Sequence, residues 1–299
     1  ILLIGISNVF VIYIGGKQYL DGEIENIGII AEFIIYVNML TWPVASLGWI
    51  SSIIQQAAAS QKRINEFLNE KSEILSKTKG YRKINGEIDI KNVSFTYSES
   101  KIKALDNVSF KLNNKKSLGI IGITGSGKTT LLKLITRSYN IDSGKILIDD
   151  REINEYDLES LRKQIGVVPQ DSFLFSDSII NNIRFGKKNA NLKEVEKVCK
   201  IVGIHHEIIN FQEGYNTILG ERGINLSGGQ KQRICIARAL IKNPKILIMD
   251  DCFSALDTET EKNIINSLKN SINSVTTIIS SHRLSSVQNL NSTIVLENG

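Results

Sequence analysis

The most apolar part of the chain is its first 54 residues, which form two hydrophobic stretches. The first, 1–14, is almost wholly apolar, and we expect Gly15-Gly16 to end it. The second covers 27–54 and is interrupted by few polar or helix-breaking residues: Glu32, Asn38 and Pro43. A helix needs about 20 mostly apolar residues to cross a membrane, so the second stretch is long enough. The first is too short unless it begins before residue 1. A buried helical hairpin of a soluble domain is the alternative.

Charge differs between the two sides of the second stretch. The connection before it carries one lysine against three acids, whereas Lys62 and Arg63 follow it. Because lysine and arginine favour the cytoplasmic side, we expect the connection to lie outside the cell and everything after residue 60 to lie inside. Glu32 would be costly in lipid, but its place near the end of the span lets it reach the interface.

Patterning after residue 60 changes from wholly apolar to amphipathic. Residues 60–70 have helical periodicity, and 72–85 are polar and lysine-rich. Apolar residues then alternate through 88–97 and 108–112, as in half-buried strands. Farther on, apolar strands alternate with helical stretches, which predicts a parallel sheet covered by helices. We therefore predict helices in 1–70, a linker in 71–85 and a second domain in 86–299.

A glycine-rich segment, 122–129, fits the phosphate-loop pattern G-x-x-x-x-G-K-[ST]. It follows an apolar strand, 117–121, and precedes a helical segment, 130–137. The glycines allow backbone N–H groups to surround a phosphate, and the helix N-terminus adds a favourable field. Lys128 supplies positive charge, and Thr129 can bind Mg²⁺ through its hydroxyl. The predicted phosphate contacts are Gly122, Thr124, Gly125, Ser126, Gly127, Lys128, Thr129 and Thr130. A structural glycine turn is the alternative.

A second candidate element is the apolar run 246–249, which ends in Asp250 and Asp251. A buried parallel strand delivers its last residues to the edge of the sheet where α/β proteins bind ligands. We expect Asp250 to hold Mg²⁺. An aspartate that caps a helix is the alternative.

The string Leu226-Ser227-Gly228-Gly229-Gln230 precedes a predicted helix, 231–242, and forms a second anion-binding helix start. It resembles the signature sequence of the ATP-binding cassette (ABC) family. The resemblance implies an α/β P-loop NTPase cassette with a RecA-like core, an antiparallel β subdomain and an α-helical subdomain, preceded by transmembrane helices.

In that family two cassettes dimerise head to tail, and each ATP lies between the phosphate loop of one and the signature of the other. The resemblance implies that Ser227, Gly228, Gly229 and Gln230 contact the partner's ATP. Other family positions match in order: Tyr97 stacks on adenine, Gln170 contacts Mg²⁺ and links to the membrane domain, Asp257 lies in an interface loop, and His282 contacts the γ-phosphate. The implied catalytic residues are Asp251, Gln170 and His282.

Two segments are similar to exporters in particular. The segment 217–223 resembles the one that touches the transmembrane helices across the dimer, and the apolar start resembles the last transmembrane helices. The resemblance implies a half-transporter of six helices, of which the first four and part of the fifth are absent here, as is the end of the cassette. It also implies a second half-transporter as partner, a bacterial inner or plasma membrane location with its lipid, a cytoplasmic cassette, and a transported substrate that the sequence does not identify.

One position departs from the family pattern. The family has a glutamate after the metal aspartate, and this chain has Asp251. The side chain is one methylene shorter, so we expect ATP to bind well and to be hydrolysed slowly. In exporters this resembles the degenerate half of a heterodimer, whose ATP serves mainly regulation. A homodimer that tolerates aspartate is the alternative.

Charge and cysteine content argue against several other classes of protein. The formal net charge is +5 and the basic residues are scattered, so we expect no nucleic-acid partner. The three cysteines form no C-x-x-C pair, so the sequence indicates neither a zinc site nor a disulfide framework. A soluble cassette ATPase acting on DNA or ribosomes is therefore disfavoured, also because the first 54 residues are so apolar.

Overall fold

A computed structural model of the protein describes residues 2–76, 78–271, 275–297 and 299. The chain divides into two compact units, Ile1–Ser72 and Glu73–Gly299, which we call unit 1 and unit 2.

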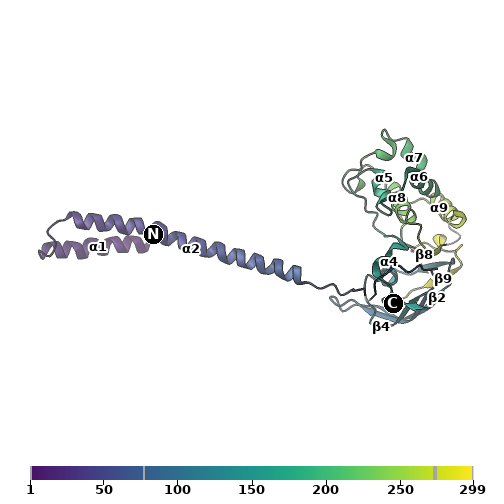
Figure 1. The fold of residues 1–299 in the computed structure, drawn as a ribbon, viewed down its shortest axis with the longest axis horizontal. Coiled ribbons are helices and arrows are strands. Elements are labelled where there is room, and N and C mark those ends of the chain that lie inside the picture. The colour runs from purple at the N-terminus through teal and green to yellow at the C-terminus, as the bar shows by residue number, and fades with distance from the viewer. Residues whose placement is uncertain (1, 77, 272–274, 298) are drawn as a thin grey trace. The chain divides into compact units, whose positions relative to one another are not determined.

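Unit 1 is a pair of antiparallel helices, α1 (Leu2–Leu20) and α2 (Gly28–Asn69), which lie side by side in Figure 1. Gly15-Gly16 end the first apolar stretch, as expected, but they do not end the helix, because α1 continues through both glycines to Leu20. A Cβ atom at Gly15 would lie 3.0 Å from Cγ1 of Ile30 on α2. Glycine costs a helix only about 1 kcal/mol per residue, so it does not by itself end one, and here it permits close packing.

Helix α2 joins the predicted span and the amphipathic stretch into one helix of 42 residues. It continues through Pro43, and none of its residues is buried. Large apolar side chains such as Trp42 and Trp49 are exposed along it. Within the described part of the chain, α2 is the one helix that is both long and apolar enough to cross a membrane. An apolar surface of this extent indicates a lipid or protein environment.

Unit 2 contains two β-sheets: the parallel sheet that the sequence pattern predicted and the antiparallel one that the family resemblance implied. The first is antiparallel with strand order β2-β1-β4-β5, and the second is parallel with order β6-β7-β8-β3-β9. The antiparallel strands are β1 (Ile88–Thr96), β2 (Lys103–Leu112), β4 (Ser143–Ile148) and β5 (Arg151–Glu152). The parallel strands are β3 (Ser117–Ile121), β6 (Ile165–Val168), β7 (Ile246–Asp250), β8 (Thr276–Ser281) and β9 (Ser292–Val295).

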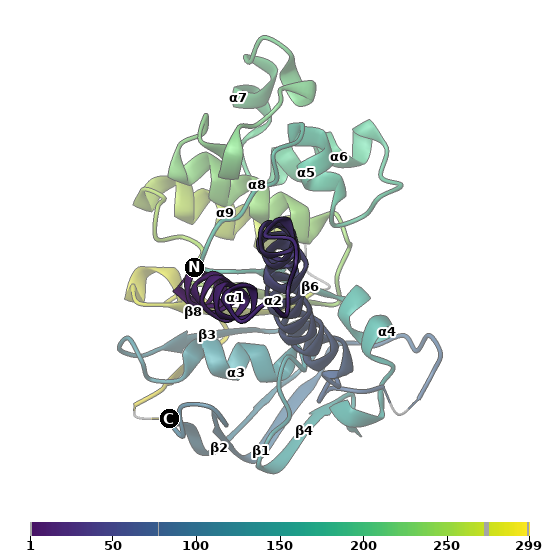
Figure 2. The same ribbon diagram turned by 90° about the vertical axis from the view of Figure 1, so that its left-hand side faces the viewer.

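Helices cover the parallel sheet and extend beyond it. They are α3 (Lys128–Ile135), α4 (Leu158–Lys163), α5 (Ile179–Arg184), α6 (Leu192–Ile201), α7 (His205–Ile209), α8 (Gly228–Leu240) and α9 (Thr258–Ser271). Short 3₁₀ helices cover Ile153–Glu155, Gly214–Asn216, Glu221–Gly223 and Leu284–Ser286. In Figure 2 helices α5 to α9 lie at one end of unit 2, the antiparallel strands lie at the other, and the parallel sheet lies between them. The class predicted from the sequence, a parallel α/β core with an antiparallel β part and a helical part, is confirmed.

Both faces of the parallel sheet are buried, which explains why its strands are continuously apolar. Along β7, Ile246 and Ile248 pack into the core that the antiparallel sheet and α3 share. The alternate residues, Leu247 and Met249, pack into the core of the helical end. Asp250 is the last residue of β7 and therefore lies at the carboxyl end of this buried strand.

The described residues between α2 and β1, 70–76 and 78–87, form no helix or strand, but hydrogen bonds attach part of this segment to the rest of unit 2. Buried Gln164 accepts a hydrogen bond from Ile84 N (2.9 Å) and donates one to Arg82 O (2.7 Å). Asp149 accepts hydrogen bonds from the backbone of residues 85–87. Much of the segment that we expected to be a linker therefore lies along the surface of the cassette.

Candidate nucleotide-binding site

The glycine-rich loop connects β3 to α3 and owes its shape to left-handed glycines. Gly125 and Gly127 have φ angles of 85° and 96°. A Cβ atom at Gly127 would lie 2.4 Å from the carbonyl oxygen of Ala104, so a side chain cannot be placed there. Because Gly127 is the N-cap, α3 begins at Lys128, two residues earlier than predicted. The helix N-terminus therefore points its free N–H groups into the loop.

Lys128 is buried at the start of α3 and bends back over its own loop. Its Nζ donates to the carbonyl oxygens of Gly122 (2.6 Å) and Ile123 (2.9 Å). Burial lowers the pKa of the Lys128 ammonium, and the nearby charges of Asp251 and Asp250 oppose this shift. An ammonium has three donors, so one remains for a phosphate oxygen.

Ser126 gives an independent indication that the loop is built for a ligand. Its hydroxyl oxygen is buried and has no hydrogen-bond partner among the described residues. Buried polar atoms are nearly always paired, so an orphan in a glycine loop fits a site completed by a phosphate. Both the loop and the hydroxyl are therefore compatible with the β- and γ-phosphates of ATP.

An open cavity of about 320 Å³ gathers most of the predicted residues from five separate segments of the chain. The predicted residues that line it are Tyr97, Thr124, Gly125, Ser126, Gly127, Lys128, Thr129, Thr130, Gln170, Asp250, Asp251 and His282. Gly122 does not line it and contributes only the carbonyl that binds Lys128. Three lining residues were missed by the sequence analysis: Ile102, Lys103 and Ala104. Ile102 ends the turn that joins β1 to β2, Lys103 and Ala104 begin β2, and no motif marks them.

Tyr97 lies at the mouth of the cavity with its ring held in place. Its hydroxyl is 3.0 Å from the hydroxyl of Thr130. The ring makes edge contacts with Phe95 and Tyr139, at centroid distances of 5.0 and 5.4 Å. A half-buried, fixed aromatic ring can stack on a nucleobase.

Two carboxylates enter the cavity at the end of β7. Asp250 is nearly buried, and its Oδ1 accepts a hydrogen bond from Ser280 Oγ at 2.6 Å. Asp251 follows in the left-handed region, with φ 43°. Its backbone N–H is 3.1 Å from both the carbonyl and the hydroxyl oxygen of Ser280. Ser280, on the neighbouring strand β8, was not singled out by the sequence analysis.

The donor set suits a hard cation that also binds phosphate. Thr129, Gln170 and Asp250 bring a hydroxyl, an amide and a carboxylate to the same cavity. Among the residues that the structure describes, no group of three or more His, Cys, Asp or Glu side chains could hold a metal alone. Mg²⁺ typically uses one or two carboxylates together with substrate phosphates and water, which fits this arrangement.

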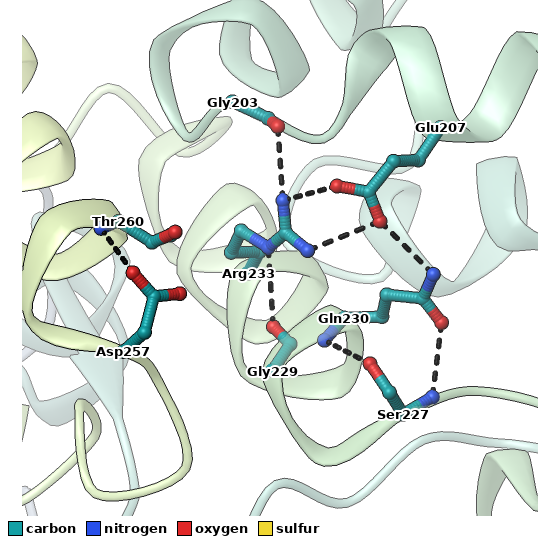
Figure 3. Close-up of polar contacts among 8 residues, drawn as sticks. All are labelled: Gly203, Glu207, Ser227, Gly229, Gln230, Arg233, Asp257 and Thr260. Atoms are coloured by element: carbon teal, nitrogen blue, oxygen red, sulfur yellow. Dashed lines mark hydrogen bonds and ion pairs between the residues drawn. The ribbon is translucent and has the colours of Figure 1, made fainter.

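The signature residues lie elsewhere, at the start of α8. Ser227 is the N-cap, and it forms a reciprocal capping box with Gln230: the Ser227 hydroxyl accepts from Gln230 N (3.2 Å), and Gln230 Oε1 accepts from Ser227 N (2.9 Å). Figure 3 shows both bonds. The helix begins at Gly228, three residues before the predicted start, because of this cap.

A partly buried ion pair between Arg233 and Glu207 contacts the signature residue Gln230 (Figure 3). Glu207 on α7 accepts hydrogen bonds from Arg233 (2.5 and 3.1 Å) and from Gln230 Nε2 (2.9 Å). Burial alone would raise the pKa of Glu207, but the bonds from Arg233 and Gln230 outweigh it and lower that pKa. The signature is thus held rigidly, while Ser227 and Gly228 stay exposed.

Asp257 lies in the loop before α9, and its Oδ1 accepts a hydrogen bond from Thr260 N at 2.8 Å. That bond lowers the pKa of the Asp257 carboxyl. Neither Asp257 nor the signature residues line the cavity. One chain therefore presents two separate surfaces.

A phosphate loop between a parallel strand and a helix, facing two strand-end aspartates, defines this protein as a P-loop nucleotide-binding cassette. Residues 105–254 match the family model described as ABC transporter. This match covers half of the chain, and the chain therefore belongs to the ABC transporter family, with an ATP-binding cassette.

Similar proteins agree over nearly the whole chain. The multidrug resistance-like ATP-binding protein MdlA of Buchnera aphidicola (subsp. Schizaphis graminum) is 43% identical over 299 residues, which are 100% of this chain and 51% of that protein. An ATP-dependent lipid A-core flippase of Syntrophus aciditrophicus is 37% identical, over 99% of this chain and 49% of the flippase. The structure of a bacterial Atm1-family ABC exporter with ATP bound matches with a TM-score of 0.79 and 33% identity, over 100% of this chain and 53% of the exporter chain. The chain thus spans about half the length of the relatives it matches.

Proposed function

We propose that this chain is the ATP-binding and hydrolysing part of an ABC exporter, together with membrane helices that precede the cassette. The observation that carries this proposal is the separation of two nucleotide surfaces. The cavity gathers the phosphate loop, the aspartates, Gln170 and His282, while the capped signature of α8 lies outside it. Two such surfaces are used together when two cassettes close on shared nucleotides.

In this proposal each residue group has a distinct task. Tyr97 stacks on the base, Lys128 and the loop N–H groups bind the phosphates, and His282 contacts the γ-phosphate. Asp251 orients the attacking water. Ser227 and the following glycines bind the ATP that belongs to the other cassette, and Asp257 lies at the interface. ATP closes the dimer because its phosphates are shared, and hydrolysis lets it reopen.

Mg²⁺ would be held by Thr129, Asp250 and Gln170 together with the phosphates. The bound ion would neutralise charge that develops on the phosphoryl oxygens. The oxygen donors of the cavity support this role.

Coupling to membrane helices is supported by an exposed aromatic cluster that begins three residues after Gln170. It comprises Phe173, Phe175 and Phe185, whose rings contact each other at 5.1 and 4.7 Å. Exposed apolar groups of this kind mark protein contacts. We assign the cluster, Gln170 and the segment 217–223 to contact with the cytoplasmic ends of the exporter's helices. Closure of the cassettes would then reorient those helices.

Asp251 favours a heterodimer as the assembly. A slow site built on this chain's phosphate loop would be paired with an active site built on the partner's loop and on this chain's intact signature. The alternative is a homodimer that tolerates aspartate. A mainly regulatory role for this chain's own ATP follows if turnover at its site is negligible.

The cellular setting follows from the same assignment. The protein lies in a bacterial inner or plasma membrane, with lipid around α2 and the cassette in the cytoplasm. Two of the relatives are named a multidrug resistance-like ATP-binding protein and a lipid A-core flippase, so the cargo that we propose is an amphipathic or lipid-like molecule. No nucleic-acid partner is proposed.

The proposal predicts that a substitution in the signature, outside the cavity, reduces ATP binding. Ser227→Ala removes the cap of the signature helix, and Ser178→Ala removes the equivalent cap of α5, whose side chain accepts from Asn181 N. Each change costs about 0.5–2 kcal/mol of stability. Only Ser227→Ala should also reduce ATP retained after gel filtration. Equal retention in the two variants would contradict a nucleotide shared through the signature.

A mixing experiment tests the sharing directly. Chains carrying Lys128→Ala and chains carrying Ser227→Arg should each retain little ATP. If two copies of this chain pair, as in the homodimer alternative, an equimolar mixture contains dimers with one intact phosphate loop facing one intact signature and recovers retention. If the chain pairs only with a different half-transporter, the mixture does not recover. A mixture no better than its components would exclude a site shared between two copies of this chain.

A further inference from the structure

Strand β8 ends in two adjacent buried serines, and one of them contacts the carboxylate of Asp250 and the backbone of Asp251. Ser280 is fully buried, and its hydroxyl donates to Asp250 Oδ1 across the β7–β8 pairing at 2.6 Å. The same hydroxyl oxygen accepts from Asp251 N at 3.1 Å. The carbonyl of Ser280 also accepts from that N–H, at 3.1 Å. One residue therefore contacts both aspartates at the cavity.

This hydrogen bond decides which oxygen of Asp250 is available. A short bond from a hydroxyl to an ionised carboxylate is about twice as strong as a neutral one. It commits Oδ1, and Oδ2 has no hydrogen-bond partner in the part of the chain that the structure describes. Because Asp250 lines the cavity, its uncommitted oxygen can offer both lone pairs to a cation there, whereas Oδ1 has already used one.

The contact between Ser280 and Asp251 N fixes the backbone conformation of Asp251, which follows β7. Asp251 has the left-handed φ of 43°, which is uncommon for a residue with a side chain. Ser280 holds its N–H through two oxygens, so this conformation is maintained by the neighbouring strand. The direction of the Asp251 side chain thus depends on Ser280.

We propose that Ser280 is a positioning residue that orients Asp250 toward Mg²⁺ and Asp251 toward the γ-phosphate end of the cavity. This proposal rests on the proposed function, because it concerns the metal-assisted step of the same site. It requires no contact between Ser280 and the nucleotide.

Ser281 provides a matched control on the same strand. It is also buried, but its hydroxyl donates to Ser286 Oγ (3.0 Å) and accepts from Arg283 N (3.0 Å). It makes no hydrogen bond to either aspartate among the described residues. Ser280→Ala and Ser281→Ala therefore remove similar buried hydroxyls with different partners.

The experiment compares ATP binding with and without the metal in the purified protein. A fluorescent ATP analogue is titrated in EDTA and then at increasing Mg²⁺. Loss of a hydrogen-bond partner of a metal-binding carboxylate typically weakens metal affinity by about 10–100-fold. We expect Ser280→Ala to bind the analogue normally in EDTA and to need at least about tenfold more Mg²⁺ for the metal-dependent gain. Ser280→Thr keeps the hydroxyl and should restore the wild-type requirement, and Ser281→Ala should match the wild type.

Each other outcome is informative. An unchanged Mg²⁺ requirement in Ser280→Ala would overturn the positioning role. Equal weakening of binding in EDTA and in Mg²⁺ would also overturn it, because that result indicates a general structural defect. If the wild-type protein fails to bind the analogue at all, the proposed function fails instead, so the two failures are distinguishable.

Discussion

Replacement of Asp251 by glutamate tests the departure from the family pattern most directly. The carboxylate of aspartate is one methylene, about 1.5 Å, closer to the backbone than that of glutamate. The backbone cannot move to compensate, because Ser280 fixes the Asp251 N–H through two oxygens at 3.1 Å. The side chain length alone therefore sets how far the carboxylate reaches.

The expected gain follows from this displacement. A misplacement near 1 Å of a group that orients a reactant can cost about 100-fold in rate. That factor corresponds to about 2.7 kcal/mol of barrier. Asp251→Glu should therefore raise turnover by up to about 100-fold. Stability should move the other way, by on the order of 1 kcal/mol, because glutamate is less suited than aspartate to the left-handed φ of 43°.

The assay is steady-state phosphate release by the purified protein, with ATP affinity and thermal unfolding measured in parallel. ATP affinity should stay constant, because Lys128 and the phosphate loop are unchanged. Asp251→Asn keeps the length and removes the charge, so it should not raise turnover. If Asp251→Glu hydrolyses ATP no faster than the wild type, the positional argument is refuted.

Two further substitutions and one labelling experiment have clear expected outcomes. Lys128→Ala should abolish most ATP affinity in a binding assay, because it removes the one ammonium of the phosphate loop; retained tight binding would contradict its role. Gln164→Ala leaves Ile84 N and Arg82 O without their buried partner. It should lower the free energy of unfolding by about 1–3 kcal/mol and expose 78–83 to trypsin, and unchanged cleavage there would exclude the attachment of this segment. Burial raises the pKa of Cys199 to about 12 and also raises the pKa values of the other two thiols. At pH 8 a thiol reagent should therefore label none of Cys199, Cys235 and Cys252 before denaturation. Labelling of the native protein would show that the helical end opens.

The sequence by itself determined the elements and the chemistry of the phosphate loop. Alternating apolar residues fixed β1 and β2, and continuous apolar runs fixed the buried strands β3 and β7, because burial on one face or on two leaves different patterns. Glycine spacing around Lys128 marked the loop, since its shape depends on local φ angles. The signature could also be found from the sequence, because its capping box joins Ser227 and Gln230, which are only three residues apart.

Helix ends and long-range contacts needed the tertiary structure. Gly15-Gly16 does not end α1, because packing against Ile30 outweighs the local weakness of glycine. No sequence motif marks Ser280, and only the pairing of β7 with β8 places it beside Asp250. Sequence patterns reflect local requirements, such as φ angles, helix caps and the burial of one or both faces of a strand. Only folding decides which distant strands become neighbours, and it is this pairing that brings a loop, two aspartates and a buried hydroxyl together around one cavity.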